Sequence, residues 1–175
     1  MKNIILIILL SIGLYYYNHM GEEIIIPDEA IRFRVIASTN STTDQEIKLK
    51  VRDDLEKEVI SDINSSTSLN ETRNTLRNNI QRYENIITNT LEKNNIKQSF
   101  SINYGMNYFP EKKYKGVKYP EGKYESLVVT LGKGEGNNWW CCLFPPLCLL
   151  EAEETGKDEV EYKFFVKELI DKYLK

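Results

Sequence analysis

Histidine is nearly absent from this chain of 175 residues: the sequence holds one, His19, inside its apolar N-terminal segment. Serine and cysteine hydrolases, HExxH zinc sites and most proton transfers near neutral pH depend on an imidazole. The sequence after His19 excludes these chemistries. Paired carboxylates or a lysine could still act, but most acidic residues fall on amphipathic stretches, where carboxylates usually form the solvated face. We therefore expect no enzyme activity, no catalytic residue, no metal site and no cofactor.

A strong charge of either sign is also lacking, because 23 Lys and Arg residues stand against 26 Asp and Glu residues, a formal net charge of −3. A mildly acidic chain binds the phosphate backbone of nucleic acids poorly, so we expect no nucleic-acid partner. The densest basic patch combines Arg32 and Arg34 with Lys48 and Arg52. This patch either forms ion pairs with neighbouring carboxylates or contacts an acidic partner or phospholipid head groups. The neighbouring carboxylates are those of Asp44, Asp53 and Asp54.

The first residues resemble an export signal. Lys2 precedes an apolar run over 4–17 that no polar face interrupts. Residues 18–21 match a small-x-small cleavage site poorly, and the run is short for a spanning helix of roughly twenty residues. We therefore predict that residues 1–21 are a signal peptide or an N-terminal signal anchor. Residues 22–175 are then an exported domain, in contact with the membrane through the N-terminal segment if that segment is not cleaved.

Apolar periodicity predicts the elements of the exported domain. Alternation over 31–37 predicts a strand that places Arg32 and Arg34 together on the face opposite its apolar side chains. Helical spacing follows over 43–63 and 68–94, which predicts an αα-hairpin.

Alternation returns over 100–108 and 127–131, which favours a long antiparallel hairpin, and 161–174 predicts a last helix. The fold class is therefore α+β: a single domain in which the αα-hairpin packs on a small, mainly antiparallel sheet, with a C-terminal helix.

Residues 134–148 hold both tryptophans, all three cysteines and two adjacent prolines. Pro145 and Pro146 cannot continue a helix or occupy a central strand position, so we predict a constrained, irregular segment. The glycines at 132, 134 and 136 do not form a phosphate-binding loop, because no helix follows them. They instead allow a turn with positive φ that orients the tryptophans.

The aromatic residues of this segment either fill the core or contact a partner. In an extended chain Trp139 and Trp140 point to opposite faces, so one can pack inward while the other stays available. We predict five partner-binding residues: Trp139, Trp140, Phe144, Arg32 and Arg34.

An exported location favours oxidation of the cysteines. A disulfide between Cys141 and Cys148 would close the loop around the two prolines. Adjacent Cα atoms lie near 3.8 Å, which is too close for an ordinary bridge between Cys141 and Cys142. A bridge between Cys142 and Cys148, or three buried thiols, are the alternatives.

Two blocks of this sequence resemble the stage II sporulation protein R (SpoIIR) family. The first comprises 26–37 and 44–53. The second comprises 120–124, the run Gly132-x-Gly134-x-Gly136-x-Asn138-Trp139-Trp140-Cys141, and 143–148. Together the two blocks span most of the exported part.

This resemblance implies a signalling protein of sporulation that is exported into the space between the forespore and mother-cell membranes. There, members of the family activate SpoIIGA, a membrane-embedded aspartic protease that processes pro-sigma-E. Two other classes of function stay open: an envelope or peptidoglycan binding module, and a cell-wall hydrolase using carboxylates such as Asp53 and Asp54.

Overall fold

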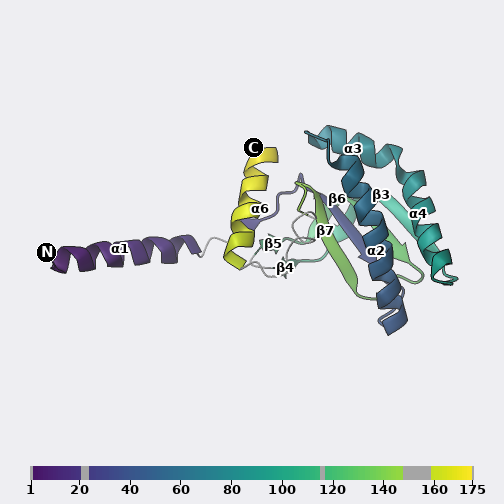
Figure 1. The fold of residues 1–175 in the computed structure, drawn as a ribbon, viewed down its shortest axis with the longest axis horizontal. Coiled ribbons are helices and arrows are strands. Elements are labelled where there is room, and N and C mark those ends of the chain that lie inside the picture. Colours follow the sequence, from purple (N-terminus) through teal and green to yellow (C-terminus); the bar gives the residue numbers. More distant parts are fainter. Residues whose placement is uncertain (1, 21–23, 115–116, 148–158, 175) are drawn as a thin grey trace.

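A four-stranded mixed sheet forms the centre of the domain (Figure 1). The computed structural model describes residues 2–20, 24–114, 117–147 and 159–174. The strand order is β3-β6-β2-β7, with β6 and β2 parallel and the two outer pairs antiparallel. The strands are β2 (Ile31–Ile36), β3 (Phe100–Phe109), β6 (Gly122–Leu131) and β7 (Asn138–Phe144). The predicted α+β fold with a mainly antiparallel sheet is confirmed.

Three helices cover one face of this sheet: α2 (Thr42–Ile63), α3 (Leu69–Asn78) and α4 (Ile80–Lys93). Ser41 caps α2 by accepting a hydrogen bond from the Asp44 N–H, and Ser68 caps α3 through the Glu71 N–H. Such caps satisfy backbone donors that the first turn leaves unpaired.

The helix predicted over 68–94 is two helices, because the chain leaves helical geometry at Asn79. The Asn79 side chain donates to the Thr75 carbonyl and its N–H donates to the Leu76 carbonyl. An asparagine that bonds to nearby backbone competes in this way with continued helix formation.

The opposite face of the main sheet is also covered. A small three-stranded sheet lies there, in the order β1 (Ile24–Ile25), β5 (Val117–Tyr119) and β4 (Lys112–Tyr114). The C-terminal helix, α6 (Glu159–Tyr173), lies beside this small sheet (Figure 1). The segment between the two long hairpin strands, predicted as a loop, therefore contains two short strands. We call β1, β5 and β4 the cover sheet.

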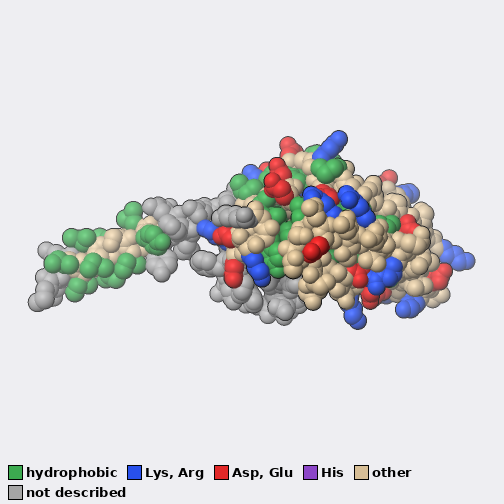
Figure 2. Space-filling model, turned by 90° about the horizontal axis from the view of Figure 1, so that it is seen from above, with side chains coloured by type: hydrophobic (Ala, Val, Ile, Leu, Met, Phe, Trp, Pro, Cys, Tyr) green, Lys and Arg blue, Asp and Glu red, His purple; other side chains and the backbone are tan. Residues whose placement is uncertain are grey.

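The N-terminal segment is a helix, α1 (Lys2–Met20), that extends away from the domain (Figure 1). Its described apolar side chains, which include Ile4, Leu9 and Leu14, are exposed (Figure 2). In the part of the chain that the structure describes, no helix combines the length and apolar content needed to cross a bilayer. Export and anchoring of this segment stay predictions.

The central strand β2 is buried on both sides. Ile31, Phe33 and Val35 belong to the main core, which lies between the sheet and the helices. On the other face of β2, Arg32 is buried, while Arg34 and Ile36 are partly buried. Beside them on β7, Cys142 packs with residues of the cover sheet and α6, and Trp140 packs with a separate cluster that contains Phe109 and Tyr124.

The turn that leads into β7 depends on glycine. Gly132 and Gly134 have φ of 52° and 68°, in the left-handed region that other residues enter at a cost. The predicted positive-φ turn is confirmed, and it directs the chain into the strand that carries both tryptophans.

Candidate partner-binding surface

The tryptophans lie on a strand and not on an irregular segment. β7 pairs with β2 from Asn138 to Phe144, so the prediction of irregular structure is wrong for these residues. The prolines follow the last residue of the strand, and the pairing with β2 shifts register just before them, between Ile31 and Arg32. Because side chains of a strand alternate, Trp139 and Trp140 point to opposite faces of the sheet, as predicted.

Trp139 faces the helices. Its ring makes an edge contact with the ring of Phe33, with centroids 5.4 Å apart, at the border of the main core. The guanidinium of Arg52, from α2, lies 5.3 Å from the centre of the Trp139 ring. Trp139 is half-buried, so it both closes the core and leaves part of its surface open.

Trp140 faces the other side and lies among cations. Its ring contacts Phe109 edge-on at 5.3 Å. The Arg34 guanidinium lies 5.6 Å and the Lys112 ammonium 5.0 Å from the ring centre. An indole is the strongest partner for such cation–π contacts. Trp140 is also half-buried.

Arg32 is inside the protein and not on its surface, with 1% of its area exposed. Its guanidinium carbon lies 3.3 Å from the centre of the Tyr124 ring, with Phe109 and Tyr119 at 5.5 and 5.8 Å. Its guanidinium stacks on the face of the Tyr124 ring, and none of its three nitrogens makes a hydrogen bond to the described residues. Burial lowers the pKa of Arg32, although the neighbouring Tyr124 acts in the opposite direction.

Arg34 follows Arg32 by two residues on the same face of β2 and is only partly buried. One of its terminal nitrogens donates to the Tyr108 carbonyl at 3.2 Å, while its Nε has no acceptor in the described structure. Burial lowers its pKa as well. Arg34 lies between the buried Arg32 and the half-exposed Trp140, so the three residues form a continuous cationic and aromatic row.

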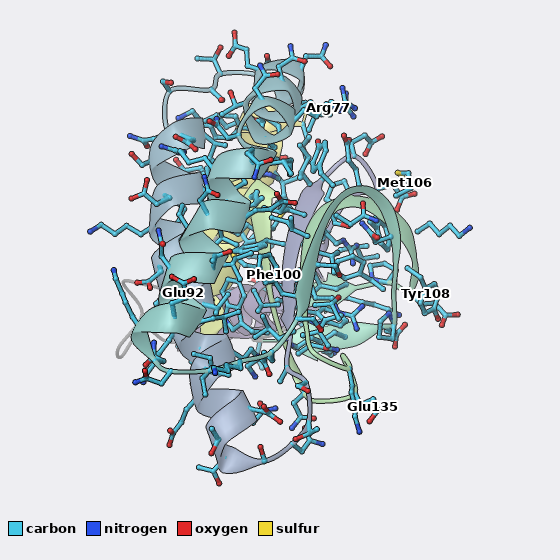
Figure 3. All side chains as sticks on the ribbon, turned by 90° about the vertical axis from the view of Figure 1, so that its right-hand side faces the viewer. Arg77, Glu92, Phe100, Met106, Tyr108 and Glu135 are labelled. Carbon is cyan, nitrogen blue, oxygen red and sulfur yellow. The ribbon has the colours of Figure 1, made fainter. Side chains whose placement is uncertain are left out.

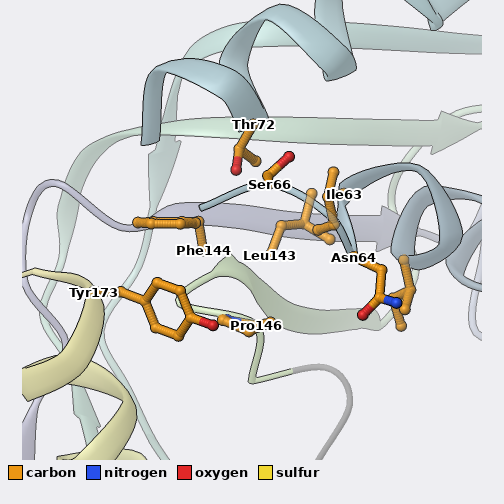
Figure 4. A pocket seen from close by; sticks show the side chains of 9 residues that line it. Ile63, Asn64, Ser66, Thr72, Leu143, Phe144, Pro146 and Tyr173 are labelled. Atoms are coloured by element: carbon orange, nitrogen blue, oxygen red, sulfur yellow. The ribbon is translucent and has the colours of Figure 1, made fainter. Parts of the chain in front are cut away.

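Phe144 is 3% exposed and makes an edge contact with Tyr173 of α6 at 5.3 Å. It lines a cavity of about 90 Å³ between α2, α3, β7 and α6 (Figure 4). That volume is well below the size of ordinary ligand pockets. The structure therefore places Phe144 in the packing between layers, away from the tryptophan rings.

The basic patch divides between the two faces. Arg52 pairs with Asp53, whereas Asp44 accepts from Thr39 and Asp54 accepts from Thr90. Lys48 lies on α2 and donates to the Gln45 side chain and to the Asn137 carbonyl, at 2.7 and 3.3 Å. Burial lowers the pKa of Lys48, and so do the charges of Arg52 and Lys112. Positive charge thus gathers on both sides of β7.

Two further exposed apolar side chains, Met106 and Tyr108, project outward from the β3–β6 hairpin, with 66% and 58% exposed (Figure 3).

The cysteines divide into two kinds. Cys141 is disulfide-bonded. Cys148 lies outside the described residues, so its pairing with Cys141 stays a prediction. Cys142 keeps its thiol, which is buried against β2. The carbonyl oxygens of Ile31 and Phe144 lie 3.4 and 3.3 Å from its sulfur and share its single S–H. Burial raises the pKa of the Cys142 thiol to about 12.

This buried thiol predicts how stability depends on pH. Above the ordinary thiol pKa of 9.0, the unfolded chain loses a proton that folded Cys142 retains up to about 12. The unfolded state then binds fewer protons, so the free energy of unfolding should fall by about 1.4 kcal/mol for each pH unit in this window. Tyr83 and Tyr104, whose pKa values burial also raises, add to this loss above pH 10.0.

Urea unfolding between pH 8 and 11 measures this slope, and Cys142→Ala is the matched variant, since it removes one titrating group. A shallower slope in Cys142→Ala is the expected result. Identical slopes would contradict a protonated thiol at this position.

The described residues contain no group of three potential metal ligands. Asp53 and Asp54 have different partners, Arg52 and Thr90, and do not act as one pair.

Sequence reasoning missed the residues around Arg32. Phe109 and Tyr124 come from β3 and β6 of the main sheet, and Tyr119 comes from β5 of the cover sheet, so they meet only in the tertiary structure. One signal was available, because Tyr124 is the last residue of the 120–124 block that resembles the family.

The fold and this surface define an α+β domain whose distinctive chemistry is an edge strand of tryptophans flanked by cations. The chain belongs to the stage II sporulation protein R family, whose sequence model matches residues 27–154. It is 41% identical over 131 residues to stage II sporulation protein R of Bacillus subtilis (strain 168). The alignment covers 75% of this chain and 58% of that protein, so this chain spans less than two thirds of its relative. No solved structure matches the chain at a significant level.

Proposed function

We propose that this chain is an exported signalling protein of sporulation that activates a SpoIIGA-like membrane protease and thereby causes the processing of pro-sigma-E. It acts in the space between the forespore and mother-cell membranes, by binding and without catalysis of its own. The observation that carries the proposal is the family match over residues 27–154, which includes the central strand and the tryptophan strand.

The surface around β7 supports a binding role. Trp139 and Trp140 are both half-buried, and Arg34, Arg52 and Lys112 contact their rings. Tryptophan and arginine are the residues that most often contribute large shares of binding energy at protein interfaces. We assign Trp140 and Arg34 to the contact with the protease, with Trp139 at its border. Phe144 supports the strand from within.

Co-expression in a host that does not sporulate tests the proposal. The host carries the full chain, the SpoIIGA-like protease and pro-sigma-E, and immunoblotting measures the conversion of pro-sigma-E to its shorter form. Conversion should require both the chain and the protease. Export of the intact chain without any conversion would overturn the proposed function.

Activation without chemistry by this chain makes a separate prediction. The triple variant with Asp53→Asn, Asp54→Asn and Glu135→Gln should retain most pro-sigma-E processing. In the proposed function none of these carboxylates acts as a general acid or base. Circular dichroism checks that the variant is folded. A folded variant that reaches the protease but supports no processing would point instead to a carboxylate-dependent hydrolase.

A further inference from the structure

Arg32 is a buried cation that the fold leaves without an anionic partner among the described residues. Its guanidinium lies among the rings of Tyr124, Phe109 and Tyr119 and near the thiol of Cys142. None of its nitrogens makes a hydrogen bond in the described structure, and no carboxylate pairs with it there. Buried charges in proteins are ordinarily paired, because an unpaired charge in an apolar interior costs a large amount of free energy. Contacts with the aromatic rings offset part of this cost.

An apolar side chain at this position would fill the same space without that cost. Replacing buried charged groups by apolar ones of similar volume is often neutral or stabilising. Stability of the isolated domain therefore does not account for an arginine here.

The cover sheet, which packs over Arg32, consists of short strands with few backbone hydrogen bonds. β1 has two residues, and β5 and β4 have three each. β1 pairs with β5 at two positions, Ile24 with Val117 and Ile25 with Lys118, and the Ile26 N–H adds one hydrogen bond to the Lys118 carbonyl. Segments with so few backbone hydrogen bonds open at a lower free energy than the domain as a whole.

The rings around Arg32 divide between the two layers. Tyr119 belongs to β5 of the cover sheet, whereas Phe109 and Tyr124 belong to the long hairpin of the main sheet. Separation of the cover sheet would expose Arg32 while Tyr124 still supports its guanidinium from one side. The exposed group would be continuous with Arg34 and Trp140.

We propose that Arg32 is a latent anchor for a carboxylate. The cover sheet separates from β2 when the partner docks, and an aspartate or glutamate on an extended acidic segment of that partner forms a bidentate pair with Arg32. This inference rests on the proposed function, since the partner is the receptor that the chain activates.

The position of the site favours a side-chain carboxylate over a lipid phosphate. The guanidinium fork binds both groups bidentately, but this site lies between two sheets, where a side chain on an extended segment can enter. A phosphate fixed in the head-group plane of a bilayer cannot enter as readily.

The first test compares full-length Arg32→Leu and Arg32→Lys with wild type, in detergent micelles and in the processing assay. Arg32→Leu should raise the urea midpoint by about 0.5 M or more and lower activation at least about tenfold. Arg32→Lys keeps the charge without the fork, so it should show no gain in stability and an intermediate loss of activation.

Arg77→Leu is the matched control, because Arg77 is an exposed arginine over the ring of Tyr104, 5.6 Å from its centre. It should change neither stability nor activation. A destabilised Arg32→Leu would make Arg32 a structural residue, and an Arg32→Leu variant with full activation would show that no partner binds it. Either result overturns the proposal.

A second test does not depend on the protease. The Nε–H signals of Arg32 and Arg34 in nitrogen-15 NMR spectra are followed as acetate replaces chloride at constant ionic strength. A saturating shift of the Arg32 signal is expected, together with faster hydrogen exchange at Val117–Tyr119. A response to inorganic phosphate alone would favour a phosphate ligand, and no response to either anion would overturn the anchor.

The two failures are distinguishable. If wild type triggers no processing but acetate shifts the Arg32 signal, the proposed receptor is wrong and the carboxylate anchor stands. If wild type triggers processing and Arg32→Leu does so equally, the proposed function stands and the anchor falls.

Discussion

The Gly136→Ala variant is expected to lose about 3 kcal/mol or more of stability, the largest effect that a single methyl group should have in this domain. A Cβ at position 136 would lie 2.2 Å from the Thr39 carbonyl oxygen and 2.6 Å from its carbon. Both are backbone atoms, which cannot move aside as the end of a flexible side chain can.

Relief of this clash would separate the start of β7 from the turn that follows β2. The Gly136 N–H donates to the Ala37 carbonyl and the Glu135 N–H donates to the Ser38 carbonyl, each at 3.0 Å, and both bonds would be strained or lost. Each such bond contributes about 1 kcal/mol.

Urea unfolding followed by circular dichroism measures the loss. Gly105→Ala is the matched control, because its Cβ would meet the Asn103 side chain at 3.5 Å, an ordinary contact distance. The control should stay within about 1 kcal/mol of wild type. Equal stability of Gly136→Ala and wild type would show that the turn is not packed as described.

The Trp140→Ala variant is expected to lose activation of pro-sigma-E processing by about thirtyfold while the domain stays folded. Truncation of an aromatic anchor at an interface commonly costs about 2 kcal/mol of binding, which corresponds to that factor. The indole lies on the edge strand, half-buried, and contacts Phe109, Arg34 and Lys112 outside the main core. Its removal should therefore affect binding more than folding.

Trp139→Ala is the comparison, because Trp139 packs against Phe33 at the border of the main core. This variant should lose more stability than Trp140→Ala. The measurements are the urea midpoint and the extent of processing at equal levels of exported protein. If both variants unfold, the two tryptophans are structural. If Trp140→Ala activates fully, the protease contacts another surface.

Elements with strong local signals could be predicted from sequence. The predicted 43–63 helix agrees with α2 to within one residue, because its apolar stripe spans the whole helix and Ser41 caps it. The hairpin of β3 and β6 followed from alternation, since long strands repeat their pattern several times. Strands of two or three residues, such as β1, β4 and β5, are too short to show a period.

The tryptophan segment shows where local reasoning failed. Pro145 and Pro146 correctly indicate that regular structure ends, but they exclude a strand only at their own positions. The pairing of β7 with β2 joins residues more than a hundred positions apart, at Arg32 and Cys142 for instance. No local pattern could report such a pairing.

The sequence by itself determined the fold class and the family. It also determined that Arg32 shares one face of its strand with Arg34, and that the two tryptophans point to opposite faces. These properties follow from residue identity and from the two-residue repeat of a strand. Only the tertiary structure decided which of these side chains meet water. The reason is that burial depends on what packs above a strand, and the cover sheet that encloses Arg32 is assembled from segments distant in the chain.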